Sequence, residues 1–248
     1  MSLDSQPQSS ATSTSTSKSR KYKMTFGTIF SYPNNPRVFK RVNTNQIQAV
    51  ANLNGHTLDN AHFKLGVDNK TDEFLDKFPL GKAPAFTSAD GVHLFESNAI
   101  AQYIAEHGPK KEQLLGSTPA ERALIQQWVA MAETEVANHV VTCFLPRVGL
   151  IPYNEAADNQ ALERLERALG ALERHLAGRT WLATSEKLSL ADIAVAASLI
   201  WGFTFVIDQE MRAKYPGVVD WFRDVTGTEG VKEAFGEIKF IEKREVPN

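Results

Sequence analysis

The stretch that decides the fold reads Ala83-Pro84-Ala85-Phe86-Thr87, then Ala89-Asp90-Gly91, then Val92-His93-Leu94-Phe95. Proline is tolerated at the start of a strand, where its missing N–H falls outside the ladder, so the first run predicts a strand. The Asp-Gly turn predicts a hairpin that returns along the last run. Glu96-Ser97 then leads into a helix predicted over Asn98 to His107, because the apolar residues there lie on one face.

The residues before this hairpin supply the rest of a mixed sheet. Short β-branched and aromatic runs indicate strands, while apolar residues at spacings of three and four indicate helices. In chain order we expect a strand at Thr25–Phe30, a helix from Arg37 to Leu53, a second strand within Thr57–Val67 and a short helix at Thr71–Phe78. The complete order, β-α-β-α-β-β-α, predicts a mixed sheet with helices on its faces.

The second half of the chain shows helical patterns and no convincing strand. Its clearest start signal is Thr118-Pro119-Ala120-Glu121, with threonine at the N-cap, proline at the first helical position and glutamate at the third. Ser189 and Asp192 form a similar signal, and the helix after them is apolar nearly all round, which predicts a central place in this domain. We expect helices from Pro119 towards Val140, over Glu155–Leu176, from Ile193 to about Phe205, over Pro216–Val225 and over Gly230–Phe235.

These elements divide the chain into two domains. Residues 1–22 are rich in Ser, Thr and Gln and predict a disordered tail. A plain tail is favoured over a transit peptide, because the segment holds one arginine and shows no amphipathic period. We place the α/β domain at 23–107, a polar linker at 108–117, the helical domain at 118–242 and a short tail at 243–248.

Composition and charge exclude several classes of protein. The net charge of −2 gives no strongly basic surface for nucleic acid, and no apolar run approaches the ~20 residues that span a bilayer. Cys143 is the sole cysteine, which excludes an internal disulfide and a cysteine-rich zinc site and fits a reducing compartment. The histidines show no metal-ligand spacing, so we expect no metal.

Three stretches carry a resemblance to a known family. They read Phe78-Pro79-Leu80-Gly81-Lys82-Ala83-Pro84-Ala85-Phe86, Leu94-Phe95-Glu96-Ser97-Asn98-Ala99-Ile100-Ala101-Gln102-Tyr103-Ile104 and Leu188-Ser189-Leu190-Ala191-Asp192-Ile193. In this order and spacing they resemble a cytosolic glutathione transferase of the phi or theta type, over Thr25 to Lys243. The resemblance implies the glutathione transferase fold, a thioredoxin-like glutathione-binding domain followed by an all-α domain. It also implies a cytoplasmic homodimer.

A closer resemblance lies within that family. Ser31-Tyr32-Pro33-Asn34-Asn35-Pro36-Arg37-Val38-Phe39-Lys40, Asn69-Lys70-Thr71 and Gly236-Glu237-Ile238-Lys239 resemble the N-terminal domain of the gamma subunit of translation elongation factor 1. That subunit continues into a lysine-rich linker and a second domain. The chain stops at Asn248, before any such linker, so we read it as either an excised domain or a stand-alone relative.

A glutathione site needs an anion for the ligand's ammonium group and a pocket for its carboxylates. By resemblance, Glu96 pairs with the γ-glutamyl ammonium, while Ser97, its backbone N–H and the helix N-terminus hold the carboxylate. The alternative for Ser97 is a plain N-cap. The resemblance also implies a cis Ala83–Pro84 bond, with the Ala83 backbone paired with the cysteinyl group. Lys70 and Lys82 lie where relatives contact the glycine carboxylate; the alternative for each is a solvated lysine.

The group that steadies the thiolate is less well defined. A free thiol has a pKa of about 8.5 and is mostly protonated at neutral pH. Relatives place a serine hydroxyl in the loop after the first strand. The aligned residue here is Asn35, whose amide offers two donors but no hydroxyl, and the alternative for Asn35 is a turn residue. Ser31 and Tyr32 are nearby candidates. This loop holds no cysteine, which argues against thiol-transferase chemistry, and Cys143 is interpreted as a small buried residue.

Two functions follow from the resemblance. In the first, the protein activates glutathione for attack on small hydrophobic electrophiles, in an interdomain pocket lined by some of Trp128, Phe144, Trp201 and Phe205. In the second, it is a dimerising, non-catalytic domain that docks the nucleotide-exchange subunit of elongation factor 1. Asn35 favours the second function or a weak form of the first. The intact Glu-Ser and Ala-Pro elements favour retained glutathione binding. We expect no direct contact with nucleic acid or membrane.

Overall fold

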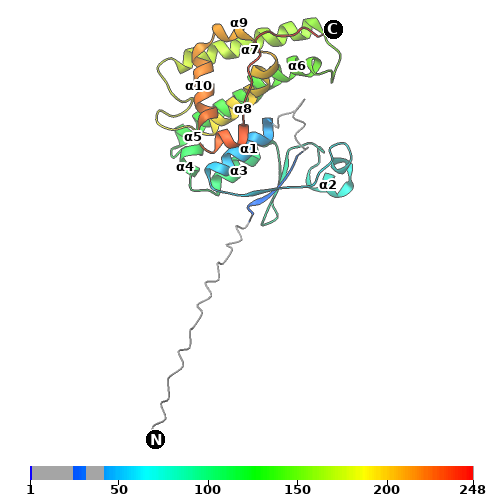
Figure 1. Ribbon diagram of the computed structural model, residues 1–248, viewed down its shortest axis with the longest axis vertical. Helices are drawn as coiled ribbons and strands as arrows, with labels where there is room; N and C mark the ends of the chain where they lie inside the picture. Colours follow the sequence, from blue (N-terminus) through cyan, green and yellow to red (C-terminus); the bar gives the residue numbers. More distant parts are fainter. Residues whose placement is uncertain (2–24, 32–41, 248) are drawn as a thin grey trace.

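A computed structural model describes residue 1, residues 25–31 and residues 42–247, with the side chains at 42 and 43 left aside. Tyr32, Asn35, nearly all of the tail predicted at 1–22 and the first part of the helix predicted from Arg37 lie outside the described residues. Figure 1 shows two packed parts, a sheet with its own helices and a larger group of helices stacked against one side of it.

A four-stranded mixed sheet forms the first part. The strands β1 (Gly27–Phe30), β2 (Leu58–Asn60), β3 (Ala85–Ser88) and β4 (His93–Phe95) lie in the order β2-β1-β3-β4. β1 is parallel to β2, antiparallel to β3, and β3 pairs with β4 as the hairpin that the sequence predicts. Parallel neighbouring strands need a crossover connection, and the helix α1 (Val42–Leu53) is part of the one that joins β1 to β2.

The two faces of the sheet carry different helices. Successive side chains of a strand point to opposite faces. Ile29 belongs to the cluster shared with α1 and with α3 (Ser97–Glu106), whereas Phe30 packs against the smaller aromatic cluster under α2 (Asp72–Lys77). A 3₁₀ turn, η1 (Asp68–Lys70), precedes α2, and Thr71 caps α2 as predicted by accepting a hydrogen bond from the Phe74 N–H.

The second part contains helices and connecting loops, with no strand among its described residues. Its helices are α4 (Lys111–Leu115), α5 (Pro119–Met131), η2 (Ala132–Ala137), α6 (Asn138–Arg147), α7 (Glu155–Leu176), α8 (Leu190–Phe205), α9 (Gln209–Ala213), α10 (Pro216–Gly227) and α11 (Val231–Phe235). α7 has the predicted bounds, and α8 lies at the centre, with buried residues on all sides. The predicted fold class is confirmed: a thioredoxin-like domain of order β-α-β-α-β-β-α precedes an all-α domain.

The long helix that starts at Pro119 runs further than the sequence predicts. It continues without a break through the π-helical turn η2 and ends at Arg147, so Pro146 lies inside it and does not bound a loop. Proline is tolerated so near the end because only a last-turn hydrogen bond is lost. The Arg147 guanidinium also anchors this end, donating two hydrogen bonds of 2.6 and 2.9 Å to the Asp158 carboxylate of α7.

Three other local predictions need correction. The second strand is limited to Leu58–Asn60, because the residues after it turn into η1. The polar stretch predicted as a linker contains α4, whose Leu114 and Leu115 are buried. The helix α9 was not predicted; it is only five residues long, and its N-cap Asp208 accepts a hydrogen bond from the Met211 N–H.

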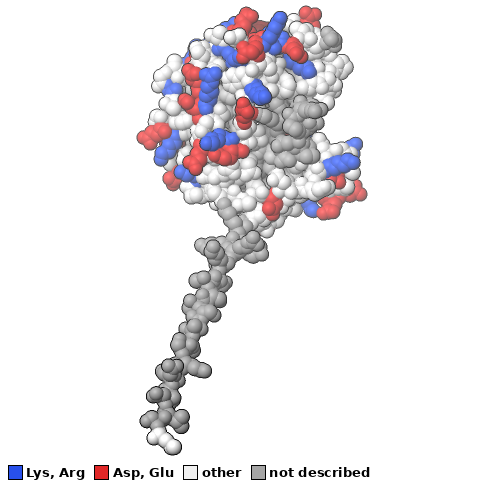
Figure 2. Space-filling model, in the orientation of Figure 1, with Lys and Arg blue, Asp and Glu red and all other residues white. Residues whose placement is uncertain are grey.

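One apolar core joins the two domains. α1 packs against α3 on the sheet and also against α8 and α11 of the helical domain. Among the described residues, no helix is long and apolar enough to cross a membrane. Over the face seen in Figure 2, lysine and arginine side chains alternate with aspartate and glutamate, and no extended patch of one sign forms.

Candidate glutathione site

The hairpin brings the Ala-Pro and Glu-Ser elements to the same end of the sheet. β3 begins at Ala85, which pairs with Phe30 of β1 on one side and with Phe95 of β4 on the other. The Ala83–Pro84 bond is therefore next to the start of α3, and it is cis, as the resemblance implies. Ala83 is half-buried, ahead of the paired part of the strand.

Glu96 makes the turn between β4 and α3 in an unusual backbone conformation. Its φ is +68° and its ψ is 119°, and it is the one non-glycine residue with positive φ in the described part of the chain. Such conformations cost about 1–3 kcal/mol and persist only where neighbouring contacts impose them. Among the residues that the structure describes, no side chain caps α3; the Glu96 carboxylate is exposed, and Ser97 behind it is 7% exposed. A free carboxylate and an uncapped helix start thus lie side by side.

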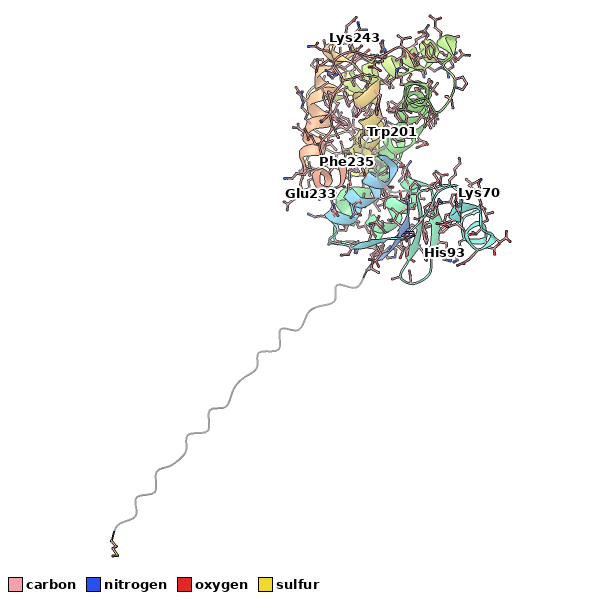
Figure 3. All side chains as sticks on the ribbon, turned by 45° about the vertical axis from the view of Figure 1, so that its right-hand side comes forward. Lys70, His93, Trp201, Glu233, Phe235 and Lys243 are labelled. Carbon is pink, nitrogen blue, oxygen red and sulfur yellow. The ribbon has the colours of Figure 1, made fainter. Side chains whose placement is uncertain are left out.

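Lys70 and Lys82 are both exposed in the segment that carries α2. Asn69 ties the two lysine-bearing turns together, since its side-chain amide donates a 2.7 Å hydrogen bond to the Gly81 carbonyl. Figure 3 shows Lys70 on the lobe beside the sheet, on the opposite side of the molecule from Glu233. The described residues include no salt bridge from either lysine, so both cations are available to a ligand or to solvent.

Ser31 is the thiolate candidate that lies within the described residues. It follows β1 directly, is 6% exposed, and its hydroxyl lies 2.8 Å from the Thr44 hydroxyl of α1. Since Phe30 pairs with Ala85, Ser31 lies next to Pro84 across the end of the ladder. Asn35 and Tyr32, the other two candidates, lie outside the described residues.

Glu133 is a carboxylate that the sequence analysis did not select. It is the second residue of the π-helical turn η2, and π-helical turns recur at functional sites. Partial burial raises the pKa of Glu133, and the nearby Glu96 carboxylate raises it further. The carboxylates of Glu96, from the α/β domain, and of Glu133, from the helical domain, therefore lie near each other. A glutamate inside a long helix gives no sequence signal of this proximity, because the proximity arises from domain packing.

Three of the four aromatic residues predicted at the interdomain pocket form a cluster. The rings of Phe144 and Trp201 are stacked with centroids 4.5 Å apart, and Phe205 lies 5.0 Å from Phe144. Trp128 is not part of it: Trp128 is buried and packs against His175 at 4.5 Å. The cluster spans α6 and α8; Phe144 is fully buried in it, whereas Trp201 and Phe205 are half-buried.

Two polar groups of the helical domain have structural environments. Cys143 is fully buried, and burial raises the pKa of its thiol to about 12, as expected of an unreactive residue. Asp192 is also fully buried and accepts hydrogen bonds from the Leu182 N–H, the Ser189 N–H and the Trp221 indole. The described residues contain no group of three or more His, Cys, Asp or Glu side chains that could hold a metal ion.

Comparison with known families identifies the class of protein. The family model described as the glutathione S-transferase N-terminal domain matches residues 27–106, and the one described as the C-terminal domain matches residues 132–229. Together these matches cover more than half of the chain. The chain belongs to the glutathione S-transferase family.

Individual relatives fall into two groups. The glutathione S-transferase-like protein LUC7 of a Fusarium species is 46% identical over 221 residues, covering 89% of this chain and 98% of the relative. Elongation factor 1-gamma of Danio rerio is 39% identical over 224 residues, covering 89% of this chain and 48% of the relative. The chain thus spans about half the length of that second relative.

Solved structures show the same pair of likenesses. The glutathione transferase-like domain of elongation factor 1-gamma from Saccharomyces cerevisiae has a TM-score of 0.75 at 26% identity, covering 91% of this chain and all of that one. The glutathione transferase URE2P6 of Phanerochaete chrysosporium, solved with oxidised glutathione, has a TM-score of 0.74, covering 85% of this chain and 94% of that one. At 18% identity the second likeness concerns the fold alone.

Proposed function

We propose that the protein binds glutathione at the junction of β3, β4 and α3 and transfers it to small hydrophobic electrophiles. The observation that carries the proposal is the pairing of an exposed Glu96 carboxylate with the uncapped start of α3, beside the cis Ala83–Pro84 bond. A carboxylate complements an ammonium group, and free N–H groups at a helix start complement a carboxylate. Glutathione carries both groups on its γ-glutamyl end.

The rest of the ligand follows from where this end is held. The cysteinyl group lies against the Ala83 backbone, where the strand ladder has not yet begun, and can pair with it as an added strand does. Lys70 and Lys82 attract the glycine carboxylate. The thiol then lies near the end of β1. There Ser31, Tyr32 or Asn35 donates a hydrogen bond to the thiolate, which lowers the pKa of the thiol.

The reaction is an attack by the glutathione sulfur on an electrophilic carbon. With a chlorinated nitroaromatic, the new C–S bond forms as the chloride leaves with its bonding electrons, and the thiol proton passes to solvent. The half-buried rings of Trp201 and Phe205, packed on the buried Phe144, are the apolar groups that we expect the acceptor to contact. Holding both reactants in one site supplies most of the rate gain, since orientation replaces a bimolecular encounter.

A steady-state assay with glutathione and 1-chloro-2,4-dinitrobenzene tests this function, beside a calorimetric titration with glutathione. We expect saturable binding and a rate above the uncatalysed reaction. If turnover is absent and the titration releases no binding heat, the proposed function is wrong.

A second function is supported by the likeness to elongation factor 1-gamma at 39% sequence identity. In this alternative the chain is a non-catalytic domain that docks the nucleotide-exchange subunit of elongation factor 1. Co-purification of the tagged protein from its own cells distinguishes the two: recovery of elongation factor subunits, with no turnover in the assay, selects the alternative.

Dimerisation is part of both proposals, with the α/β domain of one chain against the helical domain of another. Apolar side chains suited to such a contact are exposed on the β3–β4 hairpin, at Val92 and Phe95, and on α5, at Leu124. Light scattering coupled to size exclusion should give twice the 27.5 kDa chain mass, and Leu124→Glu should shift the mass towards the monomer. A wild-type monomer at micromolar concentration would contradict this arrangement.

A further inference from the structure

The turn at Glu96 depends on something that fixes the start of α3. The positive φ of Glu96 is a costly conformation, so the contacts on both sides of it must hold it in place. On one side the ladder does this, because Phe95 of β4 pairs with Ala85 of β3. On the other side the first turn of α3 must be held against its neighbours.

Apolar packing alone does not fix that turn. α3 lies on α1 through fully buried side chains, among them Ile47 and Val50 of α1 and Ala101 and Ile104 of α3. The hydrophobic effect is non-directional, so burial by itself does not select which polar atoms of the two helices meet. A hydrogen bond, in contrast, requires a defined distance and angle between two atoms.

One such bond crosses the interface, from Gln46 to Asn98. Gln46 is 3% exposed, and its side-chain amide donates a hydrogen bond of 2.8 Å to the side-chain carbonyl of Asn98. Asn98 is the residue directly after Ser97. A buried amide in apolar surroundings is costly unless it is paired, so the two side chains are constrained to meet. This contact locks the first turn of α3 to α1.

The locked turn sets the direction of the groups that would grip the ligand. Ser97 and Asn98 are consecutive residues of one helical turn, so the bond that holds Asn98 also holds the backbone of Ser97 and the direction of its N–H. Site groups must be held within a fraction of an ångström, by neighbours that do not themselves touch the ligand. Gln46 comes from α1, far from Glu96 in sequence, and is placed to do this.

We propose that Gln46 is a positioning residue for the γ-glutamyl end of glutathione, acting through Asn98 on the Glu96–Ser97 turn. The proposal rests on the proposed glutathione site and adds a named determinant of selectivity to it. Gln46 sets how well the protein distinguishes glutathione from cysteinylglycine, the same thiol peptide without its γ-glutamyl group. It does not set the reactivity of the bound thiol.

The test compares Gln46→Met with the wild type and with Gln48→Met. Methionine keeps the length of glutamine and removes the donor. Gln48 is the matched control, because it lies on the same helix and its amide also donates a 2.8 Å hydrogen bond to an asparagine, but to Asn52 within α1. Calorimetry gives the Kd of glutathione, displacement gives that of cysteinylglycine, and thermal unfolding checks that each variant is folded.

We expect Gln46→Met to raise the Kd of glutathione by about tenfold, within the range for a lost hydrogen bond near charged groups. The Kd of cysteinylglycine should be unchanged, and kcat at saturating glutathione should stay within twofold. Gln48→Met should alter neither Kd. Asn98→Ala should match Gln46→Met, and the double variant should be no worse than either, because both remove the same bond.

Four outcomes would overturn the inference. Equal losses for both thiols would make Gln46 a general structural residue, and additive losses in the double variant would mean that it does not act through Asn98. An unchanged Kd for glutathione in a folded Gln46→Met would remove Gln46 from the site while leaving the proposed function intact. A wild type that does not bind glutathione would overturn both proposals together.

Discussion

The starts of α3 and α8 each carry a serine and a carboxylate, but the two carboxylates lie in opposite environments. At α8, the Asp192 carboxylate is buried and gathers hydrogen bonds from the Ser189 N–H, the Ser189 hydroxyl and the Trp221 indole. At α3, no side chain in the described part of the chain caps the helix, and the exposed Glu96 carboxylate follows a backbone with positive φ. The carboxylate at the start of α8 is satisfied within the protein, whereas the carboxylate at the start of α3 is exposed.

The difference separates stabilising polar groups from binding ones. A carboxylate that already accepts several buried hydrogen bonds can take no ligand without unfolding its surroundings. An exposed carboxylate at a helix start stabilises the fold little. The backbone strain at Glu96 therefore needs an explanation other than stability. We therefore expect changes at α8 to act on stability and changes at α3 to act on glutathione affinity.

The largest effect is expected at the start of α8, from Asp192→Ala. It leaves the Leu182 N–H and the Trp221 indole without their buried acceptor. The loss should be about 3–5 kcal/mol, which lowers the Tm by roughly 10 °C in a chain of this size. Thermal unfolding measures it. An unchanged Tm would mean that Asp192 is not the anchor described here.

A smaller effect, mainly on glutathione binding, is expected from Ser97→Ala at the start of α3. Loss of a hydrogen bond to a ligand carboxylate should weaken the binding of glutathione by about 1.5–3 kcal/mol, which raises the Kd roughly 10- to 100-fold. The Tm should fall by less than about 2 °C. Ser189→Ala is the matched control at α8, and it should lower the Tm without changing the Kd. The reverse pattern would refute the distinction between the two helix starts.

Glu96→Gly should move stability and binding in opposite directions. Glycine adopts positive φ without strain, so the variant should be more stable by up to about 1 kcal/mol. Glutathione should bind more weakly, because the partner of its ammonium group is gone. Paired measurements of Tm and calorimetric Kd check this. A variant with lower Tm and unchanged Kd would show that Glu96 serves the fold and not the ligand.

The smallest effect is a pH dependence at Glu133. Burial and the Glu96 carboxylate raise its pKa above the ordinary value of 4.5, so the folded protein holds this proton more tightly than the unfolded chain does. Stability is therefore lost as the pH rises from 4.5 through the raised pKa. Glu133→Gln should raise the Tm slightly at pH 7 and change it far less at pH 4, where the Glu133 carboxyl is mostly protonated in both the folded and the unfolded chain. A stabilisation that is equal at both pH values would exclude the carboxylate charge as its cause.

The sequence predicted the elements with strong local signals and missed those that depend on packing. The bounds of α7 and the β3–β4 hairpin follow from apolar spacing and from an Asp-Gly turn, which act over a few residues. The passage of the long helix through Pro146 and the proximity of Glu133 to Glu96 were missed, since contacts between distant segments decide them.

The same division holds for the candidate site. The motif resemblance predicted the cis Ala83–Pro84 bond, but it gave no indication of the positive φ at Glu96 or of the bond from Gln46 to Asn98. Both depend on how α1 and β4 meet the start of α3. The roles of Lys70 and Lys82 stay predictions, as does the choice among Ser31, Tyr32 and Asn35.

A crystal structure of the protein with glutathione tests the central claim most directly. The account predicts the γ-glutamyl carboxylate about 3 Å from the Ser97 hydroxyl and N–H, its ammonium beside Glu96, and the cysteinyl backbone paired with Ala83. Glutathione bound anywhere else, or an α3 start filled by the protein's own side chains while the ligand is bound, would contradict it.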